Sequence, residues 1–88
     1  VKKFELSQNY PNPFNPTTTI QYGLLQTGMV RLTLYNILGQ EIRTLVNEVK
    51  EAGTHTINLN ASDLNSGVYI YKIESGSFTQ TKKMTLVK

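Results

Sequence analysis

His55 is the only imidazole in the chain, and it is the first side chain to consider for catalysis. It lies in residues 54–60, where His55, Ile57 and Leu59 occupy alternate positions, so a strand would place all three on one face. A catalytic imidazole needs a nucleophile within reach and a carboxylate that orients it, and no spacing in the sequence suggests that set. We therefore expect a half-buried structural ring bonded to a carbonyl or hydroxyl group, and no enzymatic activity of this chain.

Oxygen-bearing side chains form two groups that could supply paired carboxylates or metal ligands: Glu41, Glu48 and Glu51, and then Asn58, Asn60, Asp63 and Asn65. The glutamates are most simply the polar face of one amphipathic segment. In the second group only Asp63 is a carboxylate, whereas Ca²⁺ takes 6–8 oxygens and usually several carboxylates. We expect turns made by Asn and Asp side chains there, with no metal and no other cofactor.

Tyr69 and Tyr71 share a face of the expected strand 67–74, which is a useful geometry for stacking on a sugar. The same two rings would fill the core of a small β-domain, and we favour that interpretation. Cysteine is absent, so disulfides, thiolate metal sites and cysteine nucleophiles are excluded. There is also no glycine-rich loop of the phosphate-binding kind.

The length of 88 residues allows one domain, spanning 1–88, with a single core. About a third of the residues are Ser, Thr, Asn or Gln, and only 17% are charged, a composition common in secreted β-domains. The net charge of +3 is not arranged as a basic stripe with interleaved aromatics, so we expect no nucleic acid binding. No apolar run approaches the roughly 20 residues that span a bilayer.

Segments of alternating character, separated by Gly, Pro, Asn or Asp, recur about every ten residues and predict an all-β sandwich or barrel. The expected strands are residues 4–8, 17–23, 29–37, 54–60, 67–74 and 78–87. The last strand should carry Met84 and Leu86 inward. Gly39 is expected to supply the positive φ of a tight turn.

Residues 41–52 fit two structures equally well on pattern alone. Ile42, Leu45, Val46 and Val49 match the spacing of an amphipathic helix. A strand with a bulge would instead place Ile42, Leu45 and Val49 inward. The surrounding all-β pattern favours the strand.

Three prolines lie within residues 9–16, at positions 11, 13 and 16. Proline cannot take part in the interior of a hydrogen-bonded ladder, so this segment should be a stiff connection. We expect Tyr10 and Phe14 to attach it to the core.

Four stretches of the sequence resemble one known family, the type A C-terminal sorting domains of the type IX secretion system. They are residues 6–18 (LSQNYPNPFNPTT), 30–41 (VRLTLYNILGQE), 66–69 (SGVY) and 82–88 (KKMTLVK). The motifs occur in the family's order and the resemblance extends over residues 6–88.

The resemblance implies an immunoglobulin-like antiparallel β-sandwich of about seven strands, with residues 41–49 as a strand. It implies a non-catalytic sorting signal on a secreted cargo, read by an outer-membrane translocon and, in many members, removed by a sortase-like peptidase that joins the cargo to an anionic lipopolysaccharide. The expected location is secreted or at the cell surface. The positions that match the family's signal are Gly67, Val68, Tyr69, Lys82, Lys83, Met84, Leu86, Val87 and Lys88.

Physical chemistry makes such a role plausible, because a lysine-bearing terminal strand with an uncovered edge offers backbone donors and positive charge to a partner. Because the sequence begins at Val1 rather than Met, we expect a piece of a longer protein. The alternative function is an immunoglobulin-like accessory module that binds polysaccharide or a protein partner. That function would depend on exposure of Tyr69 or Tyr71.

Overall fold

The structure is a computed structural model that describes residues 3–88. It contains seven strands: β1 (Glu5–Leu6), β2 (Thr17–Leu24), β3 (Gly28–Asn36), β4 (Glu41–Lys50), β5 (Gly53–Asn60), β6 (Gly67–Ser75) and β7 (Phe78–Leu86). Gly39, in the turn after β3, has φ +83°, as expected. Among these residues there is no helix that could cross a membrane.

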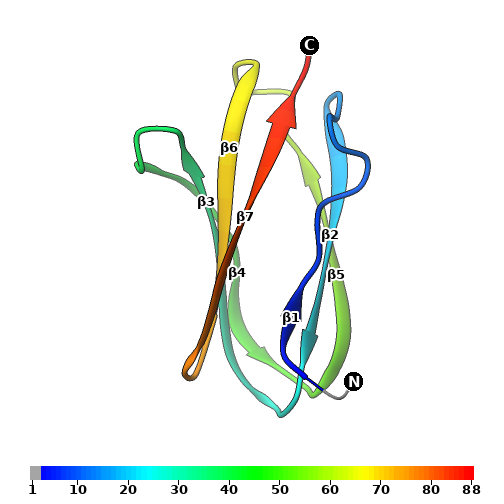
Figure 1. Ribbon diagram of the computed structural model, residues 1–88, viewed down its shortest axis with the longest axis vertical. Coiled ribbons are helices and arrows are strands. Elements are labelled where there is room, and N and C mark those ends of the chain that lie inside the picture. Colours follow the sequence, from blue (N-terminus) through cyan, green and yellow to red (C-terminus); the bar gives the residue numbers. More distant parts are fainter. Residues whose placement is uncertain (1–2) are drawn as a thin grey trace.

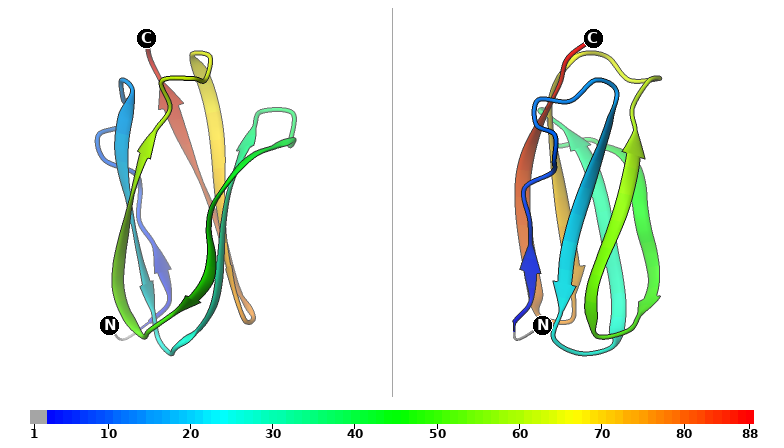
Figure 2. Two further views of the ribbon diagram at one scale, coloured as in Figure 1. Left: turned by 180° about the vertical axis from the view of Figure 1, so that it is seen from behind. Right: turned by 90° about the vertical axis from the view of Figure 1, so that its right-hand side faces the viewer.

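The strands form two antiparallel sheets that pack face to face (Figures 1 and 2). One sheet has the order β1-β2-β5, and the other has the order β4-β3-β6-β7. The prediction of an all-β, immunoglobulin-like sandwich of about seven strands is confirmed. The edge strands β1 and β7 of the two sheets lie next to each other on one side (Figure 1).

Alternation along the strands produces the core between the sheets. Val30, Leu32 and Leu34 of β3 are fully buried, as are Tyr71 and Ile73 of the neighbouring β6. Burial of each large apolar side chain contributes about 1.5–3 kcal/mol to stability. The opposite sheet contributes its own alternating set: Thr18, Ile20, Tyr22, Leu24 and Leu59.

The β4 strand exists as predicted, but its inward residues differ from the expected ones. Two β-bulges interrupt its pairing with β3, at Leu45 and at Ile42. Each extra residue reverses the side to which the following side chains point. Val46 therefore lies in the core, whereas Ile42 is 37% exposed and Val49 is 65% exposed. The prediction that Ile42 and Val49 point inward is wrong.

The first strand is shorter than predicted because the chain leaves the β1–β2 ladder after Ser7. The Ser7 amide donates to Gln21 O of β2. The Asn9 amide, which is buried, donates instead to the Tyr71 hydroxyl of the opposite sheet. Beyond it, residues 8–16 form an irregular segment that we call the strap. Phe14 of the strap is buried as predicted, whereas the side chain of Tyr10 is 81% exposed and does not pack on the core; Tyr10 holds the strap through its backbone, which pairs with Thr19 of β2.

Candidate functional site

The residues that match the sorting signal come together at one end of the four-stranded sheet. The start of β6 pairs with the end of β7, in the register Gly67↔Leu86, Val68↔Thr85 and Tyr69↔Met84. The structure thus places positions that are 15 or more residues apart on neighbouring strands, close to the carboxyl-terminal end of the chain (Figure 1).

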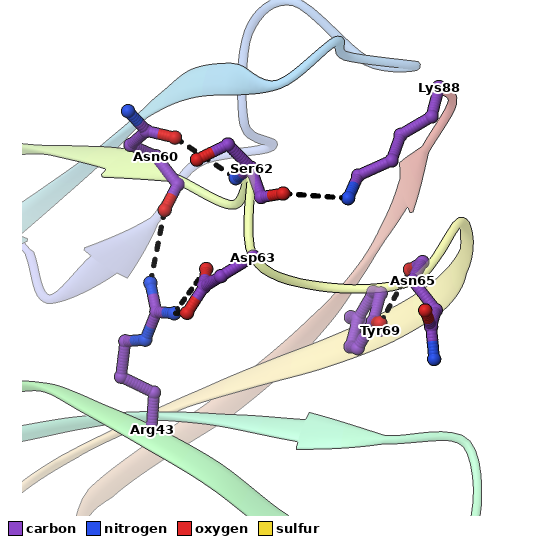
Figure 3. Close-up of polar contacts among 7 residues, drawn as sticks. All are labelled: Arg43, Asn60, Ser62, Asp63, Asn65, Tyr69 and Lys88. Atoms are coloured by element: carbon purple, nitrogen blue, oxygen red, sulfur yellow. Dashed lines mark hydrogen bonds and ion pairs between the residues drawn. The ribbon is translucent and has the colours of Figure 1, made fainter.

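A third of these nine residues belong to the core rather than to the surface. Tyr69, Met84 and Leu86 are each no more than 8% exposed. The Tyr69 hydroxyl donates to the carbonyl oxygen of Asn65 at 2.6 Å, which holds the loop before β6 (Figure 3). A partner cannot contact these three buried side chains without opening the sandwich. They therefore contribute to a signal only indirectly, by holding the exposed residues around them in place.

The exposed residues of the set face different directions. Lys83 pairs with Ile70 on the outer face of the sheet, whereas Lys82 pairs with the buried Tyr71 and is half-buried on the core side. Lys88 extends past the strand and donates from Nζ to the carbonyl oxygen of Ser62 at 2.7 Å (Figure 3). The three lysines therefore do not form one cationic cluster.

The loop between β5 and β6, residues 61–66, supports the Lys88 side chain. The Asn60 side-chain oxygen accepts from the Ser62 amide at 3.0 Å, which confirms the predicted turn. Arg43 of β4 donates to both carboxylate oxygens of Asp63 at 2.8 Å and to the carbonyl oxygen of Asn60 at 3.1 Å (Figure 3). The Arg43 guanidinium is the main cause that lowers the pKa of Asp63, and the nearby Lys88 acts in the same direction.

The free edge of β7 is covered where the family's signal lies, so the expectation of an uncovered terminal edge is wrong there. The Phe14 amide donates to Thr85 O at 3.0 Å, and the Val87 amide donates to Phe14 O at 2.9 Å. The Thr85 amide donates to the Asn12 side-chain oxygen, and the Gln8 side chain donates to Lys83 O. The strap thus satisfies the backbone of residues 83–87 that the sheet leaves unpaired.

Sequence reasoning missed these supporting residues as members of the site. Gln8, Asn12 and Phe14 are more than 70 positions from their partners in β7, and no local periodicity connects them. The available signal was the placement of short polar side chains between prolines. Such residues bind backbone groups that proline-interrupted segments leave unpaired.

The other candidates for chemistry are engaged in structural contacts. The His55 ring is half-buried, stacks on Tyr22 at 5.5 Å between centroids, and contacts Glu51 O at 2.6 Å, which confirms its predicted structural environment. Glu41 pairs with Arg31 at one end of β4, and Glu48 pairs with Lys50 at the other. Within residues 3–88 no group of three or more His, Cys, Asp or Glu side chains is placed to hold a metal ion.

Comparison with known proteins shows which family the chain belongs to. The family model described as "Secretion system C-terminal sorting domain" matches residues 8–88, nearly the whole chain. The chain belongs to this family of sorting domains. Sorting domains of this kind act as secretion signals, and the family is in general non-catalytic.

A solved structure of the family's secretion system has the same fold. The chain is similar to part of PorZ, an essential bacterial surface component of the type-IX secretion system of Porphyromonas gingivalis, with a TM-score of 0.60 and 22% identity. The match covers 99% of this chain and 12% of the PorZ chain. No curated protein matches the chain.

Proposed function

We propose that this domain directs a secreted cargo protein through the outer-membrane translocon of a type IX system and then supports attachment of the cargo at the cell surface. The family match over residues 8–88 carries the proposal. The partners are the translocon and a sortase-like peptidase, with an anionic lipopolysaccharide as the attachment point.

The exposed part of the proposed signal consists of Val68, Lys83, Val87 and Lys88 around the end of β7. Val87 and Lys88 are exposed, and within residues 3–88 each makes a single hydrogen bond, to Phe14 O and to Ser62 O. Lys83 stands on the outer face of the sheet. These positions offer apolar contact and positive charge to a partner without disturbing the core.

The alternative function, a sugar-binding accessory module, requires an exposed Tyr69 or Tyr71 ring, and neither ring is exposed. Tyr71 is fully buried and Tyr69 is 8% exposed, so neither ring forms a stacking platform. No other observation in the described residues favours that function, and the sorting signal remains our proposal.

The test is export of a reporter protein that carries this domain at its carboxyl end, in a bacterium with a type IX system. Lys83→Glu and Lys88→Glu should each reduce export by about tenfold or more, since a reversed charge at a recognition contact disfavours binding. Lys3→Glu is the matched control, because Lys3 is exposed and lies outside the family match. Unchanged export of both variants, with the fold intact by circular dichroism, would overturn the proposal.

A further inference from the structure

The β4 strand leaves one edge of the larger sheet open. The order β4-β3-β6-β7 makes β4 and β7 the two edge strands, and the strap covers the end of β7. Among the described strands, β4 pairs only with β3. An open edge presents unpaired backbone amides and carbonyls that another strand can extend.

The bulge at Leu45 changes which residues of β4 share a face. Arg43 is in register with the buried Leu34, and Glu48 is in register with the buried Val30, so both point to the core side. In a regular strand, residues five positions apart point to opposite faces. The extra residue at the bulge shifts the alternation by one, so Arg43 and Glu48 point to the same face. For the same reason Thr44 and Asn47 both point to the outer side, where they pair with Thr33 and Arg31.

As a consequence, residues 43–48 (RTLVNE) are complementary to themselves when read antiparallel. Arg43 of one copy, whose guanidinium also binds Asp63 and Asn60 O of its own copy, would face Glu48 of the other on the core side. Thr44 would face Asn47 on the outer side, and Leu45 would face Val46, both of which pack against the core in each copy. Opposite charges, polar side chains and apolar side chains are thus each matched, and such cross-strand pairs stabilise a sheet.

The ends of this complementary segment are also defined. The second bulge, at Ile42, breaks the register beyond Arg43, so the pairing stops after six residues. Leu45 is only partly buried in one copy, and an added strand would cover its open flank. Among the described residues the Glu48 carboxylate pairs only with the half-buried Lys50, and its side chain is 63% exposed, so it can turn toward a second copy.

We propose that two copies of this domain associate through β4, in an antiparallel pairing of residues 43–48 around a two-fold axis. The same patch serves both copies, as in an isologous dimer, and the two larger sheets become one continuous sheet. A six-residue edge is well below the area of a standard interface of about 1,600 Å². The dimer should therefore be weak, with a dissociation constant on the order of 0.1–1 mM.

The first experiment tests the register by disulfide trapping, because the native chain has no cysteine. Thr44→Cys and Asn47→Cys are mixed at equal concentration and oxidised; both positions are exposed. The proposed register places these two side chains opposite each other, whereas Thr44 and its own copy are three residues apart, about 10 Å along the strand and beyond disulfide reach. We expect the mixed disulfide to exceed about 90% of the cross-linked product, given that difference in reach.

The control mixes Thr44→Cys with Thr79→Cys, an exposed position on the opposite edge strand β7. Only a statistical amount of mixed product is expected there. If the Thr44–Asn47 mixture also gave only the statistical ratio of mixed to homodimeric disulfide, the proposed pairing of β4 with a second copy would be overturned.

The second experiment measures association of the unmodified 88-residue chain by sedimentation and by amide chemical shifts across a concentration series. Shifts should change at residues 43–48. Glu48→Lys should weaken the dimer by about tenfold, because a lysine would face Arg43. Glu51→Lys makes the same charge change outside the segment and should leave association unchanged. Monomeric behaviour up to about 1 mM, or shifts confined to another surface, would overturn the proposal.

Discussion

The Tyr71 hydroxyl joins two parts of the chain that lie more than 60 positions apart. It accepts from the Asn9 amide at 2.8 Å and donates to Ser7 O at 2.7 Å. Burial raises the pKa of Tyr71 to about 12, so the phenol stays protonated and keeps its donor at neutral pH. One core side chain therefore fixes the start of the strap against the opposite sheet.

Tyr71→Phe should lower the free energy of unfolding by about 1–3 kcal/mol, because it leaves a buried amide and a carbonyl without their shared partner. Urea denaturation monitored by circular dichroism measures this change. Tyr35→Phe is the matched control: Tyr35 is half-buried and its hydroxyl makes no hydrogen bond within residues 3–88, so its loss should change stability by less than about 0.5 kcal/mol. Equal effects of the two substitutions would contradict the role of the Tyr71 hydroxyl.

The Arg43–Asp63 ion pair predicts a pH dependence with a definite sign. The Arg43 guanidinium lowers the pKa of Asp63 below the ordinary value of 3.8, so ionised Asp63 favours the folded state. That contribution is present above about pH 4 and is lost as the pH falls through the lowered pKa. Asp63→Asn should therefore have a lower Tm than the wild type at pH 7, and the difference should shrink toward pH 2.

Thermal unfolding at several pH values checks this expectation. Glu51→Gln makes the same chemical change at a carboxylate outside the ion pairs of the described residues, and its Tm at pH 7 should match that of the wild type. A Tm difference for Asp63→Asn that persists undiminished at pH 2 would show that the charge of Asp63 is not the cause.

Sequence patterns predicted those single residues whose environment depends on their own strand. His55 faces the core because it alternates with polar neighbours, and Tyr69 and Tyr71 share one face of their strand because they are two positions apart; the structure places all three on the core side. The strap residues Asn9 and Asn12 were not identified, because their partners, Tyr71 and Thr85, come from distant parts of the chain. Such contacts follow from the packing of the two sheets and leave no periodic trace in the sequence.

At the level of elements, the strands that alternate cleanly were located to within one or two residues, and β4 was the difficult one. Its apolar residues recur at intervals of three and four, which is the spacing of an amphipathic helix, whereas the two bulges turn only Leu45 and Val46 of these to the core side. A bulge is set by the pairing with a neighbouring strand, so the sequence of β4 alone does not specify which residues turn inward. The strand was predictable, but its buried face was not.

The strap should tolerate change at one aromatic residue and not at the other. Phe14 is 2% exposed and its backbone pairs with residues 85–87, whereas Tyr10 in the same segment is 81% exposed. Phe14→Ala should lower the free energy of unfolding by about 3–5 kcal/mol because it leaves a cavity, and Tyr10→Ala should change it by less than about 0.5 kcal/mol. Urea titration of both variants measures this, and a cost for Tyr10→Ala similar to that of Phe14→Ala would contradict the assignment.

For the molecule as a whole, folding and recognition overlap at the carboxyl-terminal end. Met84 and Leu86 are core residues, while Val87 and Lys88 are exposed and follow directly after the last strand. Removal of the last ten residues would take β7 out of the sandwich and destroy the fold. Loss of export after such a deletion would therefore not distinguish a missing signal from an unfolded domain.

Deletion of Val87 and Lys88 alone separates the two effects. It removes the bonds from the Val87 amide to Phe14 O and from Lys88 Nζ to Ser62 O, at a cost of about 1–2 kcal/mol. The sandwich core remains, so the truncated domain should keep its circular dichroism spectrum and a cooperative unfolding transition. Export of the reporter fusion should nevertheless fall to background, because two of the exposed residues of the proposed signal are gone. Normal export of this truncation would remove both residues from the signal and leave Val68 and Lys83 as its exposed part.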